Sequence, residues 1–181
     1  GVGKDDCLIS RVQAQFPEAQ IVHRLDLATS GLLLLARGEA MQRRFSQLFR
    51  ERLVHKTYIA VVAGQVMQAE GEIDLPLITD WPNRPLQKVD FDIGKPSLTR
   101  YRCLGYDAAS DSTRLLLEPV TGRSHQLRVH LAAIGHPILG DLLYAGAHRL
   151  RAPRLLLHAA SLLLPHPLSG EACRFDCLPP F

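Results

Sequence analysis

The chain has 181 residues, of which 46% are hydrophobic and 22% charged, and its formal net charge is +3. This length suffices for one domain with a sizeable core, and the composition is that of an ordinary globular protein. No apolar run reaches the length of a membrane span, so we expect no membrane partner. The mildly positive charge permits a nucleic-acid partner without requiring one.

Cysteine usage points to a reducing compartment. The four cysteines are Cys7, Cys103, Cys173 and Cys177, and no Cys-x-x-Cys pair occurs among them. Their spacing is not that of a zinc site, so we expect free thiols and a cytoplasmic protein.

Hydrophobic periodicity predicts the elements in chain order. Asp6 is placed to cap a helix over Cys7–Phe16. A strand over Val22–Asp26, a turn and a second, buried strand over Leu32–Leu35 follow. The remaining predicted elements are a helix at 39–51, strands at 56–63, 71–77, 97–106 and 113–119, a helix from Thr121 as its N-cap to Gly135, and strands at 154–159 and 172–177. Strands joined mostly by turns indicate an α+β fold with a mixed, mostly antiparallel central sheet and flanking helices.

Two charged residues share one face of the first predicted strand. Arg24 and Asp26 are two positions apart, so their side chains point to the same side. They stand at the open end of a strand that continues into the core, which favours a functional role. The alternative is a surface ion pair that contributes little to stability.

Arg123 supplies a second indication of function. It lies at the predicted start of a helix, where the macrodipole disfavours a cation unless an anion sits beside it. A phosphate of a ligand or a carboxylate of the protein would meet this need, and Asp26 is the carboxylate that we choose. An arginine beside Asp26 keeps the carboxylate ionised, which suits a nucleophile or base and not a proton donor.

The segment from Thr79 to Gly94 is irregular and places Trp81 and Arg84 between prolines. Interleaved aromatic and basic residues on a loop suit stacking on bases and contact with phosphates. The alternative is a structural loop with Trp81 packed in the core.

Metal and nucleotide cofactors have no support in the sequence. His125 and His130 are five residues apart and do not share a helix face as an i, i+4 pair would. No glycine-rich phosphate loop is present. We therefore expect neither a metal nor a cofactor.

Four segments together resemble a known family. His-Arg-Leu-Asp-x-x-Thr-Ser-Gly at 23–31 resembles the signature of the RluA family of pseudouridine synthases. Segments 56–58, 121–128 with 136–141, and 154–159 resemble the same family in the same order. Segment 80–85 is similar to that of the dual-specificity member, which acts on both 23S ribosomal RNA and tRNA.

The resemblance implies a mixed-sheet catalytic domain with a central cleft, which isomerises uridine to pseudouridine in RNA without cofactor or metal. Asp26 would be the nucleophile, attacking either the ribose C1′ or the uracil ring. Tyr58 would lie against the base, and Arg123 would pair with Asp26.

The resemblance also implies contacts with the substrate. Arg24 would occupy the space left by the flipped nucleotide. Leu155 or Leu157, which share a strand face, would form an apolar wall against the uracil. Trp81 and Arg84 would contact RNA from their loop.

Members of the family carry a strand with an Asn-Lys-Pro-x-Gly-like motif ahead of this region. We expect residues 1–181 to form a single catalytic domain that lacks this strand segment, has no S4-type domain and acts as a monomer. An RNA-binding module without catalytic activity is the alternative function.

Overall fold

The computed structural model describes residues 7–181, so the proposed capping residue Asp6 lies outside the described residues. The helices are α1 (Leu8–Gln13), α2 (Glu39–Arg50) and α3 (Gln126–Ala133), with short helical turns η1 (Trp81–Asn83) and η2 (Gly146–Leu150). The strands are β1 (Ala19–Ile21), β2 (Ser30–Gly31), β3 (Leu35–Arg37), β4 (His55–Ala63), β5 (Glu70–Asp74), β6 (Leu77–Thr79), β7 (Gln87–Val89), β8 (Leu98–Asp107), β9 (Ser112–Pro119), β10 (Leu157–Pro165) and β11 (Ala172–Asp176).

A seven-stranded sheet forms the body of the protein, in the order β11-β10-β4-β9-β8-β5, with β2 added beside β10. All of its pairings are antiparallel except that of β2 with β10. Two short hairpins, β1–β3 and β6–β7, stand apart from it. The predicted α+β class with a mixed, mostly antiparallel sheet is confirmed.

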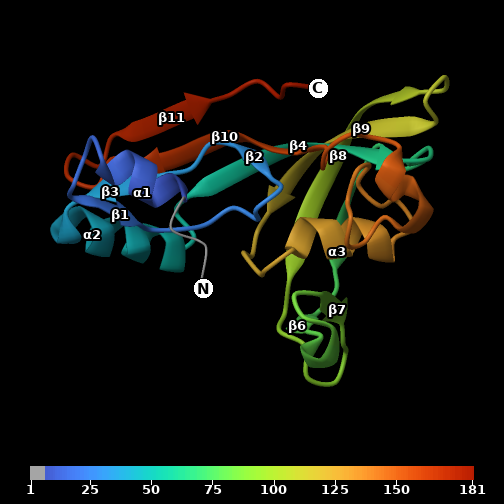
Figure 1. Cartoon of the computed structure of the whole chain (residues 1–181), viewed down its shortest axis with the longest axis horizontal. Coiled ribbons are helices and arrows are strands. Elements are labelled where there is room, and N and C mark those ends of the chain that lie inside the picture. The colour runs from blue at the N-terminus through green and yellow to red at the C-terminus, as the bar shows by residue number, and fades with distance from the viewer. Residues whose placement is uncertain (1–6) are drawn as a thin grey trace.

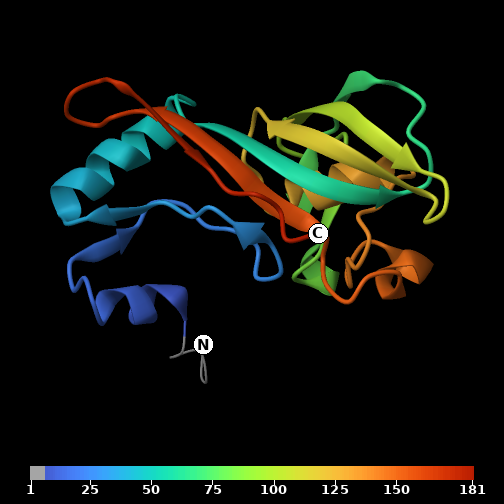
Figure 2. The ribbon, with the colours of Figure 1, turned by 90° about the horizontal axis from the view of Figure 1, so that it is seen from above.

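The helices cover the sheet at two ends. Figures 1 and 2 show α1, α2 and the β1–β3 hairpin at one end, and α3 with β5, β8 and β9 at the other. The long strands β4 and β10 run between these groups, and the β6–β7 hairpin projects away below α3 (Figure 1). Within residues 7–181, no helix is both long and apolar enough to cross a membrane.

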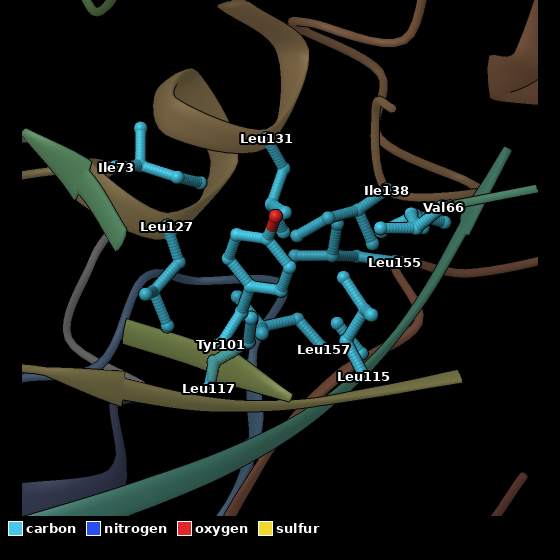
Figure 3. Close-up of a cluster of buried hydrophobic side chains, with 12 residues drawn as sticks. Val66, Ile73, Tyr101, Leu115, Leu117, Leu127, Leu131, Ile138, Leu155 and Leu157 are labelled. Carbon is cyan, nitrogen blue, oxygen red and sulfur yellow. The ribbon is translucent and has the colours of Figure 1, made fainter. Parts of the chain in front are cut away.

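The main core lies between α3 and the sheet (Figure 3). Leu127 and Leu131 on α3 face Leu115 and Leu117, which are fully buried on β9. A second cluster forms where α2 packs on β10. The main core therefore fixes the first turn of α3 against the sheet.

The predicted strands at 22–26 and 32–35 are wrong, apart from Leu35, which begins β3. The strands of this region are β1 and β3, and residues 22–29 form an irregular loop before β2. Two hydrogen bonds hold the segment 32–34 that follows β2: the Leu34 N–H donates to His23 Nε2 over 2.9 Å, and the Leu32 N–H donates to the Ala159 carbonyl over 3.0 Å. Alternating side chains produced the strand prediction, but these hydrogen bonds replace a ladder.

The helix predicted from Thr121 begins later, at Gln126. Thr121 Oγ1 donates to Gln126 Oε1 over 2.7 Å and does not cap the helix. His125 occupies the N-cap position in a left-handed conformation, with φ of 54°. The segment 121–125 is therefore a loop that leads into α3.

Candidate active site

A basic cleft of about 750 Å³ opens between the 22–29 loop, the end of α2, strand β4 and the 119–128 segment. Eight of its lining side chains are lysine or arginine: Arg24, Arg50, Arg52, Lys56, Arg100, Arg123, Arg128 and Arg174. Only two lining side chains are carboxylates, Asp26 and Glu118. The cleft therefore favours a polyanion.

Asp26 lies at the inner wall of this cleft, with its side chain 17% exposed. Arg128 Nη1 lies 3.5 Å from Asp26 Oδ2, and His125 Nε2 lies 3.9 Å from Asp26 Oδ1. The Asp26 carbonyl accepts a hydrogen bond from the Thr29 N–H over 2.9 Å, which closes a tight turn. The turn presents the carboxylate to the cleft beside a cation.

Arg128 is itself held from behind by Asp141. Its Nε and Nη2 donate to the two Asp141 oxygens over 2.7 and 2.6 Å, in a bidentate pair. The Asp141 side chain is fully buried and that of Arg128 is 6% exposed. Asp141 Oδ1 also accepts the N–H groups of Leu143 and Tyr144. A bidentate pair fixes the guanidinium plane, so the orientation of Nη1 toward Asp26 is set in advance.

The predicted pairing of Arg123 with Asp26 is wrong. Arg123 lines the cleft but is exposed, and within residues 7–181 the basic side chains that contact Asp26 belong to Arg128 and His125. The reason is the later start of α3, which places Arg128 in the first helical turn. The requirement for an anion beside a cation at a helix start holds there, and Arg128 meets two carboxylates.

Tyr58 projects from β4 into the same cleft. Burial, together with the nearby Asp26 carboxylate, raises the pKa of Tyr58 to about 12. Both causes disfavour the phenolate, so the hydroxyl keeps its proton throughout the physiological range.

Only one of the two leucines proposed as an apolar wall against the uracil lies at the cleft. Leu157, on β10, lines the cleft, whereas Leu155 belongs to the main core and does not. Arg24 lines the cleft and is exposed. Trp81 and Arg84 lie on the β6–β7 hairpin, outside the cleft lining.

Trp81 is exposed, as the nucleic-acid interpretation of its loop requires, and is not packed in the core. The Trp81 side chain is 64% exposed, and the Arg84 guanidinium lies over its ring at 4.8 Å from the centroid. The hairpin thus presents an aromatic face beside a cation, at the tip of a projection (Figure 1).

Burial shapes the charges of two other cleft residues. His23 has a pKa lowered to about 4, chiefly by burial and also by the Lys56 ammonium. Burial also lowers the pKa of Lys56. His23 is therefore a neutral acceptor for the loop backbone and adds no charge to the site at neutral pH. Among residues 7–181, no group of three or more His, Cys, Asp or Glu side chains could hold a metal ion.

Comparisons with known proteins show the family of this chain. The family model for RNA pseudouridylate synthase matches residues 4–133. This chain belongs to the RNA pseudouridylate synthase family. The dual-specificity RNA pseudouridine synthase RluA of Escherichia coli K12 is 52% identical over 171 residues, covering 94% of this chain and 78% of the relative. RluA of Yersinia pestis is 52% identical over 173 residues, covering 95% and 84%.

A solved structure supports the same family. Human RNA pseudouridylate synthase domain containing 1 superposes with a TM-score of 0.85 at 32% identity, covering 98% of this chain and 76% of that one. Members of the RNA pseudouridylate synthase family are isomerases that act on RNA, and this chain is such an enzyme.

Three residues of the site escaped the sequence reasoning: Arg128, His125 and Asp141. One signal for Arg128 was present, because it stands between Leu127 and Val129 in a helix that packs on the core, where a buried cation needs a partner. His125 was weighed only as a metal ligand. Nothing local marks Asp141 as the partner, since the two residues meet through the tertiary fold.

Proposed function

We propose that this enzyme isomerises uridine to pseudouridine in structured RNA, that its substrates are 23S ribosomal RNA and the tRNA anticodon stem-loop, and that Asp26 is the nucleophile. The observation that carries the proposal is the position of Asp26. One carboxylate, oriented by a buried arginine, faces a cleft in which cations outnumber carboxylates by eight to two. The similarity to relatives named as dual-specificity enzymes supports the choice of RNAs.

The reaction breaks the N1–C1′ glycosidic bond, forms a C5–C1′ bond, releases the C5 proton and returns a proton to N1. Atoms and electrons balance without an oxidant or a co-reactant. Asp26 attacks the ribose C1′ or the uracil ring and is released when the new bond is complete. Arg128 directs the carboxylate toward the substrate.

Tyr58 and Leu157 are the groups that we assign to the base itself. They project from the adjacent strands β4 and β10 into the cleft. The ring of Tyr58 offers a face for the uracil, and its hydroxyl serves in the proton transfer that restores aromaticity, in which C5 loses its proton and N1 gains one. Leu157 excludes water from one side of the base.

The remaining basic residues serve the rest of the RNA. A uridine inside a helix cannot reach Asp26, so the nucleotide must flip into the cleft. Arg24, exposed at the mouth of the cleft, is placed to fill the space that the nucleotide leaves. Arg123 contacts a phosphate of the RNA and does not pair with Asp26. Trp81 and Arg84 bind RNA beyond the cleft, where the hairpin projects.

We propose further that the enzyme acts as a monomer in the cytoplasm, where ribosomal and transfer RNA are made. Asp26, Arg128 and Tyr58 all come from the same chain, so the site needs no second copy to complete it.

The test uses transcripts of the two RNAs labelled with tritium at uridine C5. Isomerisation releases the label into water, and mapping of pseudouridine then identifies the position. Transcripts with the same composition and a scrambled loop serve as the control. We expect release from both natural RNAs and none from the control. Binding of both RNAs with no release from either would support the RNA-binding module instead.

A further inference from the structure

Tyr144 lies between the β6–β7 hairpin and the cleft, and its hydroxyl contacts both. The Gln87 N–H, on β7, donates to Tyr144 Oη over 2.9 Å, and His125 Nδ1 lies 2.6 Å from the same oxygen. The Arg128 guanidinium lies over the Tyr144 ring, 5.1 Å from its centroid. The other nitrogen of His125, Nε2, faces Asp26 Oδ1.

We propose that Tyr144 is a positioning residue that holds His125 in the neutral tautomer protonated on Nε2, with this N–H directed at Asp26. Because the Gln87 N–H already donates to Tyr144 Oη, the Tyr144 hydroxyl proton needs an acceptor of its own. His125 Nδ1 is that acceptor, since a half-buried hydroxyl without one would be costly. A neutral imidazole that accepts at Nδ1 carries its proton on Nε2.

The other side of the imidazole leads to the same tautomer. An ionised carboxylate accepts hydrogen bonds and donates none. A bare Nε2 lone pair facing Asp26 would therefore be repelled, whereas an Nε2–H is attracted. The contact of Nδ1 with Tyr144 and that of Nε2 with Asp26 therefore indicate the same tautomer independently.

Burial favours the neutral form of His125, and charges of both signs surround it. Those that face it are two carboxylates and two guanidinium groups: Asp26, Asp141, Arg128 and Arg24. Burial is the largest influence and lowers the pKa of His125, with further lowering by the two arginines and opposition from the two carboxylates. Burial also raises the pKa of Tyr144, so its hydroxyl retains the proton that it donates.

The backbone of His125 is consistent with a side chain held for a purpose. Its φ of 54° lies in the left-handed region, which is uncommon for a residue other than glycine. The imidazole makes no capping hydrogen bond to α3 from this position. Strain of this kind persists where the surroundings fix a side chain at a functional site.

The consequence concerns the approach of the nucleophile. The 3.9 Å between Nε2 and Oδ1 is longer than a hydrogen bond, so a movement of about 1 Å brings the N–H into range of Asp26. A neutral donor orients the carboxylate without the charge of an imidazolium, which would hold it back from attack. This inference extends the proposed function and, for its kinetic arm, depends on it.

Nitrogen NMR of the His125 side chain tests the tautomer in the parent protein, with no substitution needed. We expect the Nε2–H form in the free enzyme. In Tyr144→Phe, which keeps the ring over Arg128, we expect a mixture of tautomers and a His125 pKa higher by about one unit, the effect of one hydrogen bond. The surface variant Tyr106→Phe, which loses a hydroxyl bonded to Asp111, is the control and leaves both unchanged.

The kinetic arm compares turnover at pH 6 and pH 8. Since His125 protonates more readily in Tyr144→Phe, its activity at pH 6 relative to pH 8 should fall below the parent ratio, and Tyr106→Phe should keep that ratio. A purely structural role would lower activity equally at both values. An Nδ1–H tautomer in the parent, or an unchanged tautomer and pKa in Tyr144→Phe, would overturn the proposal. The NMR result stands whether or not RNA is isomerised, so its failure is distinguishable from failure of the proposed function.

Discussion

The buried pair between Arg128 and Asp141 gives the strongest prediction about stability. Arg128→Met keeps a similar volume but removes two hydrogen bonds, of 2.7 and 2.6 Å, and leaves the fully buried Asp141 carboxylate without its cation. Breaking such a pair on one side costs about 3–5 kcal/mol. This is a large part of the roughly 5–15 kcal/mol that stabilises a typical domain.

A double variant separates stability from activity. In Arg128→Met with Asp141→Asn, the introduced amide oxygen still accepts the N–H groups of Leu143 and Tyr144, and the buried position 141 carries no charge. We expect it to be more stable than the single variant by about 2 kcal/mol or more. Both variants should lose about a hundredfold or more in isomerisation, because Asp26 is without its guanidinium partner in each.

Urea unfolding followed by circular dichroism measures the first effect, and tritium release measures the second. Arg43→Met, which removes an exposed helix pair with Glu39, is the control and should change stability by less than about 0.5 kcal/mol. A cost below about 1 kcal/mol for Arg128→Met, or a double variant no more stable than the single one, would refute this reasoning.

Three further predictions concern the loop, its histidine and the hairpin. In Gly31→Ala, at φ of 107°, the new Cβ would lie 2.7 Å from the Ala159 backbone nitrogen, so we expect unfolding or a displaced loop by circular dichroism. Gly38→Ala, with open space around it, should cost only about 1–3 kcal/mol of backbone strain, from its φ of 80° and ψ of 164°. The pKa of His23 is lowered from 6.5 to about 4, so the unfolded chain takes up a proton before the folded protein does as pH falls. Urea unfolding should therefore show a free energy of unfolding up to about 2 kcal/mol lower at pH 5 than at pH 8 from this residue. The His23→Gln variant should lack this loss. Trp81→Ala should raise KM for RNA about tenfold or more with kcat unchanged, as loss of one stacked base predicts, whereas a fall in kcat alone would argue against a binding role.

Sequence patterns were sufficient for the long elements of the fold. Helix α2 and strands β4, β8 and β9 repeat their apolar residues with clear periods, and the turn at 107–111 separates two of them. The side chains of 22–26 alternate and predict a strand, but the structure has an irregular loop there, and the backbone of the following segment 32–34 bonds to His23 and β10. Alternation reports which way side chains point and does not report how the backbone is paired.

The sequence alone predicts only part of the site. The charge of Asp26 and its place in the signature were visible in the sequence, as was the need for an anion near the start of α3. The choice between Arg123 and Arg128 depended on where the helix begins, and helix boundaries are hard to place when the N-cap is an unusual residue such as a left-handed His125. The roles of Asp141 and Tyr144 rest on contacts between distant segments, which no local pattern encodes.

The central claim is that Asp26 is the nucleophile of an isomerase. Single-turnover tritium release by Asp26→Asn, with enzyme in excess over labelled tRNA stem-loop, tests it most directly. The control is Asp74→Asn, an exposed position on the edge strand β5 that does not line the cleft. We expect Asp26→Asn to bind the RNA and release no tritium, and Asp74→Asn to release it at the parent rate. Release by Asp26→Asn near the parent rate would contradict the claim.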